Sequence, residues 1–142
     1  AYGGEFRQGF AATRDGPRTI TRWTSGLRTA MNAVPGHTTL FGSLRHAAFT
    51  DDNALLFVHA GIAARRPLAS QGDAFWWGGD DILTLNGRFE GFRRVVRGYD
   101  RDRRGLVESE FAASLDAGCG RGGALLAACF DDAGAVAETC EG

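Results

Sequence analysis

Leu55-Leu56-Phe57-Val58-His59-Ala60-Gly61 is the stretch that decides the fold. Its four apolar residues follow the polar run Asp51-Asp52-Asn53 and end on an imidazole, which is the pattern of a short buried strand over residues 54–59. His59 then stands at the carboxyl end of that strand, where layered α/β folds open their sites. The two small residues that follow leave room beside the ring for a ligand, a metal ion or another backbone. The alternative for a lone histidine is a core position with its ring bonded to a carbonyl group.

Size and composition bound the class of protein. The chain has 142 residues, of which 44% are hydrophobic and 11% aromatic, enough for one domain with a hydrophobic core. The net charge of −1 argues against a nucleic-acid-binding surface. The sequence has no apolar run long enough to cross a bilayer, and its first residues lack the pattern of a signal peptide. We therefore expect a cytoplasmic protein with neither nucleic acid nor membrane as a partner.

The three cysteines carry little information about function. The spacings of Cys119, Cys129 and Cys140 fit no zinc pattern, and their odd number argues against a disulfide framework. Reduced thiols are the simplest interpretation. Cys119 lies between two glycines without a charged partner in the sequence, so we do not expect it to act as a nucleophile.

Helical periodicity is strongest early in the chain. Apolar residues recur at spacings of three and four between Pro17 and Pro35-Gly36, which predicts a helix over 17–34. These residues are Ile20, Trp23, Leu27, Ala30, Met31 and Val34. The first sixteen residues show little periodicity and predict no helix. A second short helix, capped by Thr38 or Thr39, is expected to carry Leu40, Phe41, Leu44 and Ala47 on one face.

Strand patterns fill the remainder of the chain. They cover residues 92–97, 110–117, 123–130 and 135–139, and Asp131-Asp132-Ala133-Gly134 predicts a hairpin between the last two. Helices followed by closely spaced strands predict an α+β or layered α/β/α fold with a largely antiparallel C-terminal sheet. We expect a single domain over 1–142, helical at 17–50 and sheet-forming at 54–139. The pair Trp76-Trp77 is expected either to line a cleft or to cover a core edge, and we favour the core edge because indoles bury a large area.

The segment from Asp100 to Phe111 resembles a calcium-binding loop at first sight. Its acidic residues stand at the first and third places, and a glycine stands at the sixth. The fifth place is Arg104, and the twelfth is Phe111 where a bidentate glutamate is needed. We reject a calcium site and interpret the segment as a charged β-hairpin connection.

A set of motifs does match a known family. In chain order they are Phe57-Val58-His59-Ala60-Gly61-Ile62, Arg66-Pro67-Leu68, Trp76-Trp77, Val95-Val96-Arg97-Gly98-Tyr99-Asp100, and Ser114-Leu115-Asp116-Ala117-Gly118-Cys119-Gly120 followed by Gly122-Gly123-Ala124-Leu125. This set resembles the C-terminal half of the calcineurin-like metallophosphoesterases, in the phosphoprotein-phosphatase branch. It is most similar to the bacterial serine/threonine phosphatase and diadenosine-tetraphosphatase type. The resemblance implies the C-terminal half of a metallophosphoesterase β-sandwich flanked by helices, incomplete as a domain.

The resemblance also implies a metal site. In this family two divalent metal ions, manganese or iron and zinc, hold the hydroxide that attacks phosphorus. His59 matches a metal ligand, and Tyr99 stands where the family has a second ligand histidine. A neutral phenol is a poor ligand for a divalent ion compared with an imidazole. The family's Gly-Asp-x-His-Gly, Gly-Asp-x-x-Asp-Arg-Gly and Gly-Asn-His-Glu motifs, which supply most of the ligands, do not occur in this sequence. We therefore expect no bound metal and no turnover from this chain alone.

Arg97 and Arg88 are the candidates for binding phosphate, with Arg93 and Arg94 as alternatives to Arg88. Asp116 is expected to accept hydrogen bonds near the site.

Three functions from different classes remain open. The first is a fragment of a metal-dependent phosphoesterase that acts on a phosphoprotein, a dinucleoside polyphosphate or another phosphorylated substrate together with a complementary N-terminal half. The second is a degenerate, non-catalytic relative that binds a protein or phosphorylated partner, which the tyrosine at the second ligand position favours. The third is an assembly module whose open sheet edge is covered by another chain. We favour the first.

Overall fold

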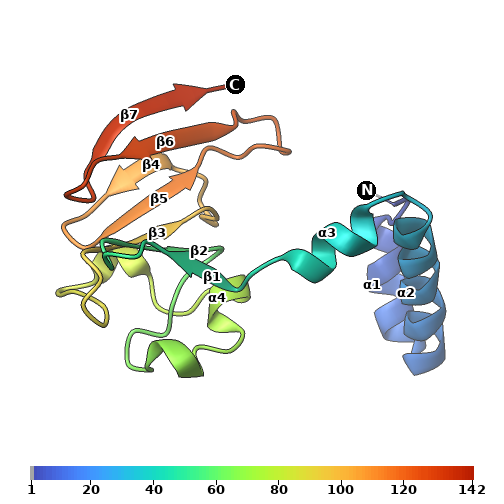
Figure 1. Ribbon diagram of the computed structural model, residues 1–142. Helices are drawn as coiled ribbons and strands as arrows, with labels where there is room; N and C mark the ends of the chain where they lie inside the picture. Colours follow the sequence, from blue (N-terminus) through green and yellow to red (C-terminus); the bar gives the residue numbers. More distant parts are fainter. Residues whose placement is uncertain (1) are drawn as a thin grey trace. The chain divides into compact units, whose positions relative to one another are not determined.

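The computed structural model describes residues 2–142, whose contacts form two compact units divided between Leu44 and Arg45. The first unit is helical and contains α1 (Phe6–Asp15), α2 (Pro17–Asn32) and α3 (His37–Ser43). The second unit, residues 45–142, contains every strand of the protein as described and the sites discussed below (Figure 1).

The helical unit contains one predicted helix and one that the sequence did not predict. Helix α2 begins at Pro17, a favourable first helical residue, and ends before Pro35-Gly36 as expected. Helix α1 lies in the stretch for which no helix was predicted. A Cβ atom on Gly9 of α1 would lie 2.7 Å from Cη2 of Trp23, so the glycine lets the indole pack directly against the helix. Contact with α2 thus stabilises α1, since a helix of ten residues is marginal in isolation.

Helix α3 is shorter than predicted. It ends at Ser43, and Leu44 has extended backbone angles. Ala47, predicted on the helix face, instead begins strand β1 (Ala47–Phe49), which the sequence analysis missed. Pairing with β2 (Leu55–Val58) satisfies the backbone groups of this short segment and overrides its helical pattern.

The main sheet has five strands in the order β1-β2-β3-β5-β4. The remaining strands of this sheet are β3 (Arg94–Arg97), β4 (Gly105–Glu108) and β5 (Ala112–Asp116). The three central strands β2, β3 and β5 run parallel, so the prediction of a largely antiparallel sheet is wrong for its centre. Only the edge strands β1 and β4 pair antiparallel. The long connection over residues 59–93 makes the parallel pairing of β2 with β3 possible, since a parallel pair needs a crossover of a dozen or more residues.

The predicted C-terminal hairpin is confirmed. Strands β6 (Leu126–Phe130) and β7 (Val136–Glu141) pair antiparallel in a separate two-stranded sheet, and Asp131 caps the turn through its side chain. The overall class is therefore a mixed α+β fold.

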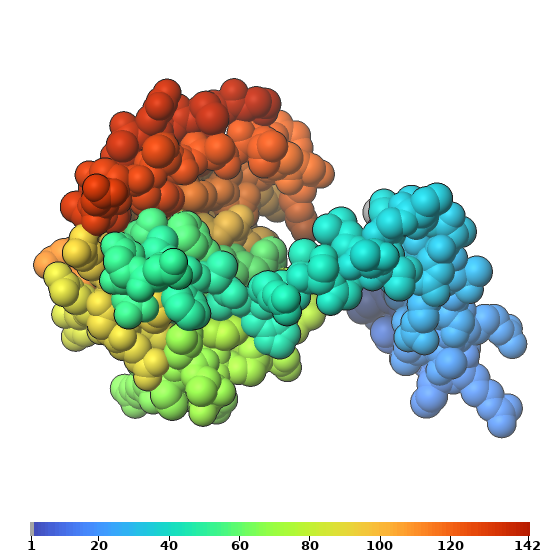
Figure 2. Space-filling view, in the orientation of Figure 1, coloured from blue at the N-terminus to red at the C-terminus, as the bar shows by residue number. Residues whose placement is uncertain are grey.

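Side chains alternate across the main sheet and build a core on each face. One face carries Leu56, Val58, Val95 and Ala112, and it packs against the crossover residues Ile62, Phe75, Ile82, Phe89 and Phe92. The opposite face carries Leu55, Phe57, Val96, Ala113 and Leu115 and packs against Phe130 of β6. The crossover contains η1 (Leu68–Ser70), α4 (Ala74–Trp77) and η2 (Ile82–Thr84), which lie below the sheet in Figure 1. The hairpin of β6 and β7, coloured orange to red, lies on the other side of the sheet and forms the outermost layer there in Figure 2.

The expectation for the tryptophan pair is wrong for one member. Trp76 is half-buried, whereas Trp77 is 82% exposed. Both residues belong to the four-residue helix α4, whose buried side chain is that of Phe75, so the second indole points away from the core.

None of the helices within residues 2–142 is both long enough and apolar enough to cross a membrane.

Candidate functional site

The two positions that the family resemblance pairs lie side by side in the structure. His59 follows the last residue of β2, and Tyr99 follows β3 by two residues. Because these strands are parallel with Val58 opposite Arg97, both side chains stand at the same end of the sheet. The imidazole of His59 is exposed and stacks on the phenol ring, with centroids 5.6 Å apart and planes inclined by 24°. It is therefore not the core histidine of the alternative interpretation.

Backbone hydrogen bonds hold this aromatic pair together. The carbonyl oxygen of His59 accepts the amide proton of Tyr99 at 2.8 Å and that of Gly98 at 3.2 Å. The next residue, Ala60, donates its amide proton to the carbonyl oxygen of Phe75 at 2.8 Å. The end of β2 is thereby fixed both to the end of β3 and to α4.

A second histidine lies close to the site and was missed in the sequence. Strand register places Ala47 opposite Val58, and continuing it by one residue sets His46 opposite His59. The ring of Trp76 lies 5.6 Å from that of His46 and 5.9 Å from that of His59. Both histidines line one cavity of about 210 Å³. Only the pairing of β1 reveals this neighbour, and the sequence did not predict β1.

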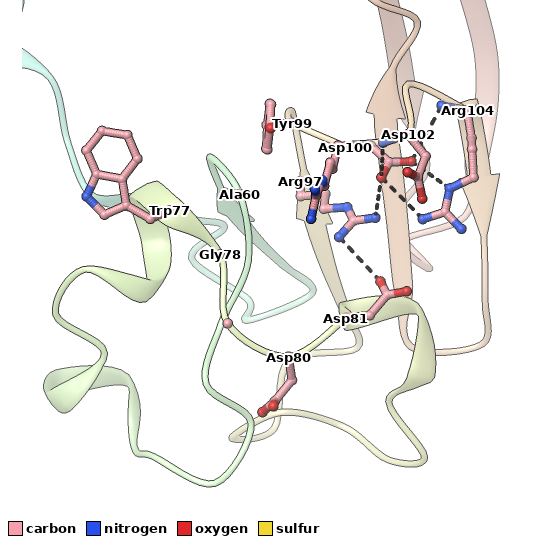
Figure 3. Close-up of a pocket in the computed structure, with 12 residues that line it drawn as sticks. Ala60, Trp77, Gly78, Asp80, Asp81, Arg97, Tyr99, Asp100, Asp102 and Arg104 are labelled. Carbon is pink, nitrogen blue, oxygen red and sulfur yellow. Dashed lines mark hydrogen bonds and ion pairs between the residues drawn. The ribbon is translucent and has the colours of Figure 1, made fainter. Parts of the chain in front are cut away.

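A cleft of about 320 Å³ opens next to the stacked pair, between the ends of β2 and β3 and the segment after α4 (Figure 3). The exposed rings of Tyr99 and Trp77 lie at its sides. The residues that line it are Ala60, Trp77, Gly78, Gly79, Asp80, Asp81, Arg97, Tyr99, Asp100, Arg101, Asp102 and Arg104. Its charged lining comprises three arginines and four aspartates, so the cleft is not an electropositive surface.

Arg97, one of the two predicted phosphate-binding residues, is only 7% exposed in this cleft. Each of its guanidinium nitrogens already has a protein partner. Nε donates to the hydroxyl of Ser114 at 3.0 Å, Nη2 to Asp100 at 3.1 Å, and Nη1 lies 3.3 Å from a carboxylate oxygen of Asp81. These bonds join β3, β5 and the start of η2, so the guanidinium group fixes the wall of the cleft.

Asp100 is the buried centre of this charge cluster, with 2% of its surface exposed. The strongest influence on its carboxyl group is the hydrogen bond from Nε of Arg104 at 2.7 Å. That bond lowers the pKa of Asp100 below its ordinary value and outweighs burial, which raises it. The backbone amide of Asp102 and the charge of Arg97 lower the pKa of Asp100 further. The hydrogen bond between Asp100 and Arg104 in turn raises the pKa of Arg104. In the segment that resembles a calcium loop, this carboxylate therefore faces two guanidinium groups.

The other predicted residues lie elsewhere. Arg88 is exposed and lines a separate cavity of about 430 Å³ together with Arg65 and Arg66. Arg93 donates to the carbonyl oxygen of Asp132 at 2.6 Å, and Arg94 pairs with Glu108. The structure thus does not bring Arg88 to the cleft at Tyr99.

Asp116 behaves as predicted. It accepts the amide protons of Asp100 at 2.9 Å and Gly118 at 2.8 Å. Its carboxylate ties together the two loops that follow β3 and β5.

The residues present do not make a metal centre by themselves. Within residues 2–142, no group of three or more histidine, cysteine, aspartate or glutamate side chains is placed to hold an ion. The nearest ring neighbours of His59 are the aromatic side chains of Tyr99 and Trp76, and neither supplies the carboxylate or imidazole that a divalent ion prefers. His59 and His46, which line the same cavity, are two imidazoles and do not complete a set of three ligands.

Comparison with known proteins supports the fold. No protein-family model matches this chain, and no curated protein matches it. A solved structure described as that of a "putative diadenosine tetraphosphatase" is similar to it, with a TM-score of 0.60 and 24% sequence identity. The match covers 87% of this chain and 62% of the other protein. The chain therefore shares the fold of that protein over most of its own length and corresponds to less than two thirds of the other protein.

Proposed function

We propose that this chain forms the His59-bearing part of a metal-dependent phosphoesterase of the serine/threonine-phosphatase or diadenosine-tetraphosphatase type. The observation that carries the proposal is the exposed imidazole at the end of β2, stacked on the residue at the second family position. The shared fold of the solved neighbour supports it. His59 supplies one metal ligand, the other ligands come from outside residues 2–142, and the 142-residue chain alone does not turn over substrate.

The two predicted phosphate-binding arginines receive different roles in this proposal. Arg97 lines the cleft at Tyr99 and is held by three partners, so it positions the loop after β3 and adds positive charge there. Arg88 lies in another cavity, and we give it no part in the cleft.

A degenerate, non-catalytic relative is the second candidate, and Tyr99 favours it. The phenol ring stacks on the imidazole from the position that matches the family's second ligand histidine, and backbone hydrogen bonds between the ends of β2 and β3 hold it there. In that case the cleft retains a phosphorylated or protein partner without hydrolysing a phosphoester.

The test uses the complete open reading frame that encodes residues 1–142, beside the 142-residue chain. Hydrolysis of p-nitrophenyl phosphate and of diadenosine tetraphosphate is measured with added manganese. We expect activity from the complete product and none from the 142-residue chain. His59→Ala is expected to reduce the activity at least a hundredfold, since even residues that only orient a metal ligand cost up to that factor.

His46→Ala is the matched control. It removes the other imidazole that contacts Trp76 and lines the same cavity, but it does not stand at a family motif position. We expect its activity to stay within about threefold of the unmodified protein. Equal losses in the two variants would show that the effect comes from the tryptophan contact and would refute the ligand assignment. Binding of phosphoester without hydrolysis by the complete product would instead establish the non-catalytic candidate.

A further inference from the structure

A basic cavity with no assigned role lies beside the cleft, between the loop after β3 and the loop after β5. Its volume is about 340 Å³. It is lined by Tyr99, Arg101, Arg103, Asp116, Gly118, Cys119 and Arg121. Tyr99 and Arg101 line this cavity and the cleft alike.

The three arginines of this basic cavity are not paired with acidic side chains. All three are exposed, and none forms a salt bridge with a carboxylate among residues 2–142, in contrast to Arg97 and Arg104 in the cleft. The single carboxylate of the cavity is that of Asp116. Its two oxygens accept backbone amide protons, one from Asp100 and one from Gly118. The guanidinium groups therefore remain available to a ligand.

The backbone shapes this cavity. Arg103 has a left-handed conformation, with φ of 52°, and its amide donates to the carbonyl oxygen of Asp100 at 3.0 Å. Non-glycine residues adopt this conformation at an energetic cost, so the surrounding contacts must hold it. One such contact is Gly118, where a Cβ atom would lie 3.1 Å from Cδ of Arg103. The bare glycine backbone gives the arginine stem a surface on which to lie, and the stem spans from one loop to the other.

We propose that the basic cavity binds a multiply charged phosphate anion, with a di- or triphosphate group as the chemical class of ligand. Guanidinium groups match tetrahedral oxyanions through paired N–H bonds. Three of them around one cavity, opposed by one carboxylate that is already satisfied, suit a ligand with several negative charges better than a single monoanion. The neighbouring cleft contains more carboxylates than guanidinium groups and does not offer this. The proposal is independent of any hydrolysis at His59.

The test is calorimetric titration of the 142-residue chain with sodium tripolyphosphate in buffer containing EDTA, which removes any contribution from metal ions. We expect one site per chain, with affinity that falls as sodium chloride is raised because exposed charges are screened. Orthophosphate should bind at least tenfold more weakly than tripolyphosphate. Citrate is a multiply charged anion without phosphate; binding of citrate as tight as that of tripolyphosphate would overturn the assignment to phosphate. ATP tests whether an esterified chain is accepted, and its binding at the same site would support that class of ligand.

The decisive variant is Arg101→Gln/Arg103→Asn/Arg121→Gln, in which asparagine is chosen because it tolerates the left-handed conformation. An exposed contact between one arginine and the bound anion contributes roughly a factor of two to five to the affinity. Loss of all three arginines should therefore lower the affinity for tripolyphosphate about tenfold to a hundredfold. The single variant Arg121→Gln, on an exposed loop, should lower the affinity for tripolyphosphate about two- to fivefold. It keeps the site testable if the triple variant does not fold.

The matched control is Arg18→Gln/Arg22→Gln/Arg28→Gln on α2. It removes the same number of exposed arginines and therefore the same net charge. We expect its affinity for tripolyphosphate to stay within twofold. A loss equal to that of the first triple variant would show a general charge effect and overturn the site, as would the absence of saturable binding to the unmodified chain.

Discussion

The charge cluster around Asp100 makes a prediction about stability that can be worked out from the structure. Asp100→Asn keeps the shape of the side chain and removes its charge. The carboxylate is buried and receives Nε of Arg104 at 2.7 Å and Nη2 of Arg97 at 3.1 Å. Hydrogen bonds to charged groups contribute about 1.5–3 kcal/mol each, and breaking a buried ion pair costs roughly 3–5 kcal/mol. The side chain of Arg104 is 39% exposed, so its share is reduced by solvent. We expect the free energy of unfolding to fall by about 2–4 kcal/mol.

Urea unfolding followed by tryptophan fluorescence measures this loss. Every protein in the series carries Trp23→Phe, so that emission comes only from Trp76 and Trp77 in the unit that contains the cluster. Asp102→Asn is the matched control, because this neighbouring aspartate is exposed and its carboxylate forms no salt bridge with residues 2–142. It should change stability by less than about 0.5 kcal/mol.

The loss should also depend on pH in a defined direction. The hydrogen bond from Arg104 lowers the pKa of Asp100 in the folded protein below its ordinary value of 3.8. Its contribution is therefore fully present above about pH 4 and is lost as pH falls through the lowered folded pKa. The difference in stability between the unmodified protein and Asp100→Asn should stay constant from pH 7 to 5 and shrink below pH 4. A difference that persists unchanged at pH 3, or a neutral-pH cost equal to that of Asp102→Asn, would refute the role assigned to the cluster.

Three further predictions follow from the geometry. Tyr99→His places a second imidazole beside His59 and should strengthen manganese binding by the complete reading-frame product about tenfold in calorimetry; an unchanged titration would show that position 99 is not the family's ligand position. Gly79→Ala should lower the free energy of unfolding in urea by roughly 2–3 kcal/mol, because its Cβ atom would lie 2.4 Å from the carbonyl oxygen of Ile62. In the control Gly87→Ala the Cβ atom meets open space, and the free energy of unfolding should change by less than about 0.5 kcal/mol. Phe130→Ala should speed amide exchange in β6 and β7 while leaving β2 and β3 protected, because the hairpin packs through this ring; a uniform loss of protection would contradict that packing.

Elements with strong local patterns were predictable from the sequence. Helix α2 has a regular apolar stripe with proline at its start and Pro35-Gly36 after its end, and β2 is an uninterrupted apolar run. The hairpin between β6 and β7 has a turn rich in aspartate and glycine. Elements that depend on distant partners were not predictable. Strand β1 has three residues and forms by pairing with β2, and α1 is a short helix that packs against Trp23 of α2.

The candidate site likewise has features that the sequence predicts and features that only the fold shows. That His59 ends a strand could be inferred from residues 55–61 alone, and its place beside Tyr99 agrees with the family motif order. The sequence could not show that the guanidinium group of Arg97 is bound within the protein, because its partners Ser114 and Asp81 come from separate elements that the fold brings together. The three unpaired arginines of the basic cavity were equally hidden. They are near in sequence to many acidic residues, and only the fold shows which carboxylates are already engaged.

The main-chain bonds from Gly98 and Tyr99 to the carbonyl oxygen of His59 have a consequence for how this protein can be altered. The backbone, and not the phenol ring, sets the spacing between the two strand ends. Position 99 should therefore accept phenylalanine, histidine or tryptophan while the imidazole keeps its place, so that the chemistry opposite His59 can be exchanged by point substitution without rebuilding the scaffold.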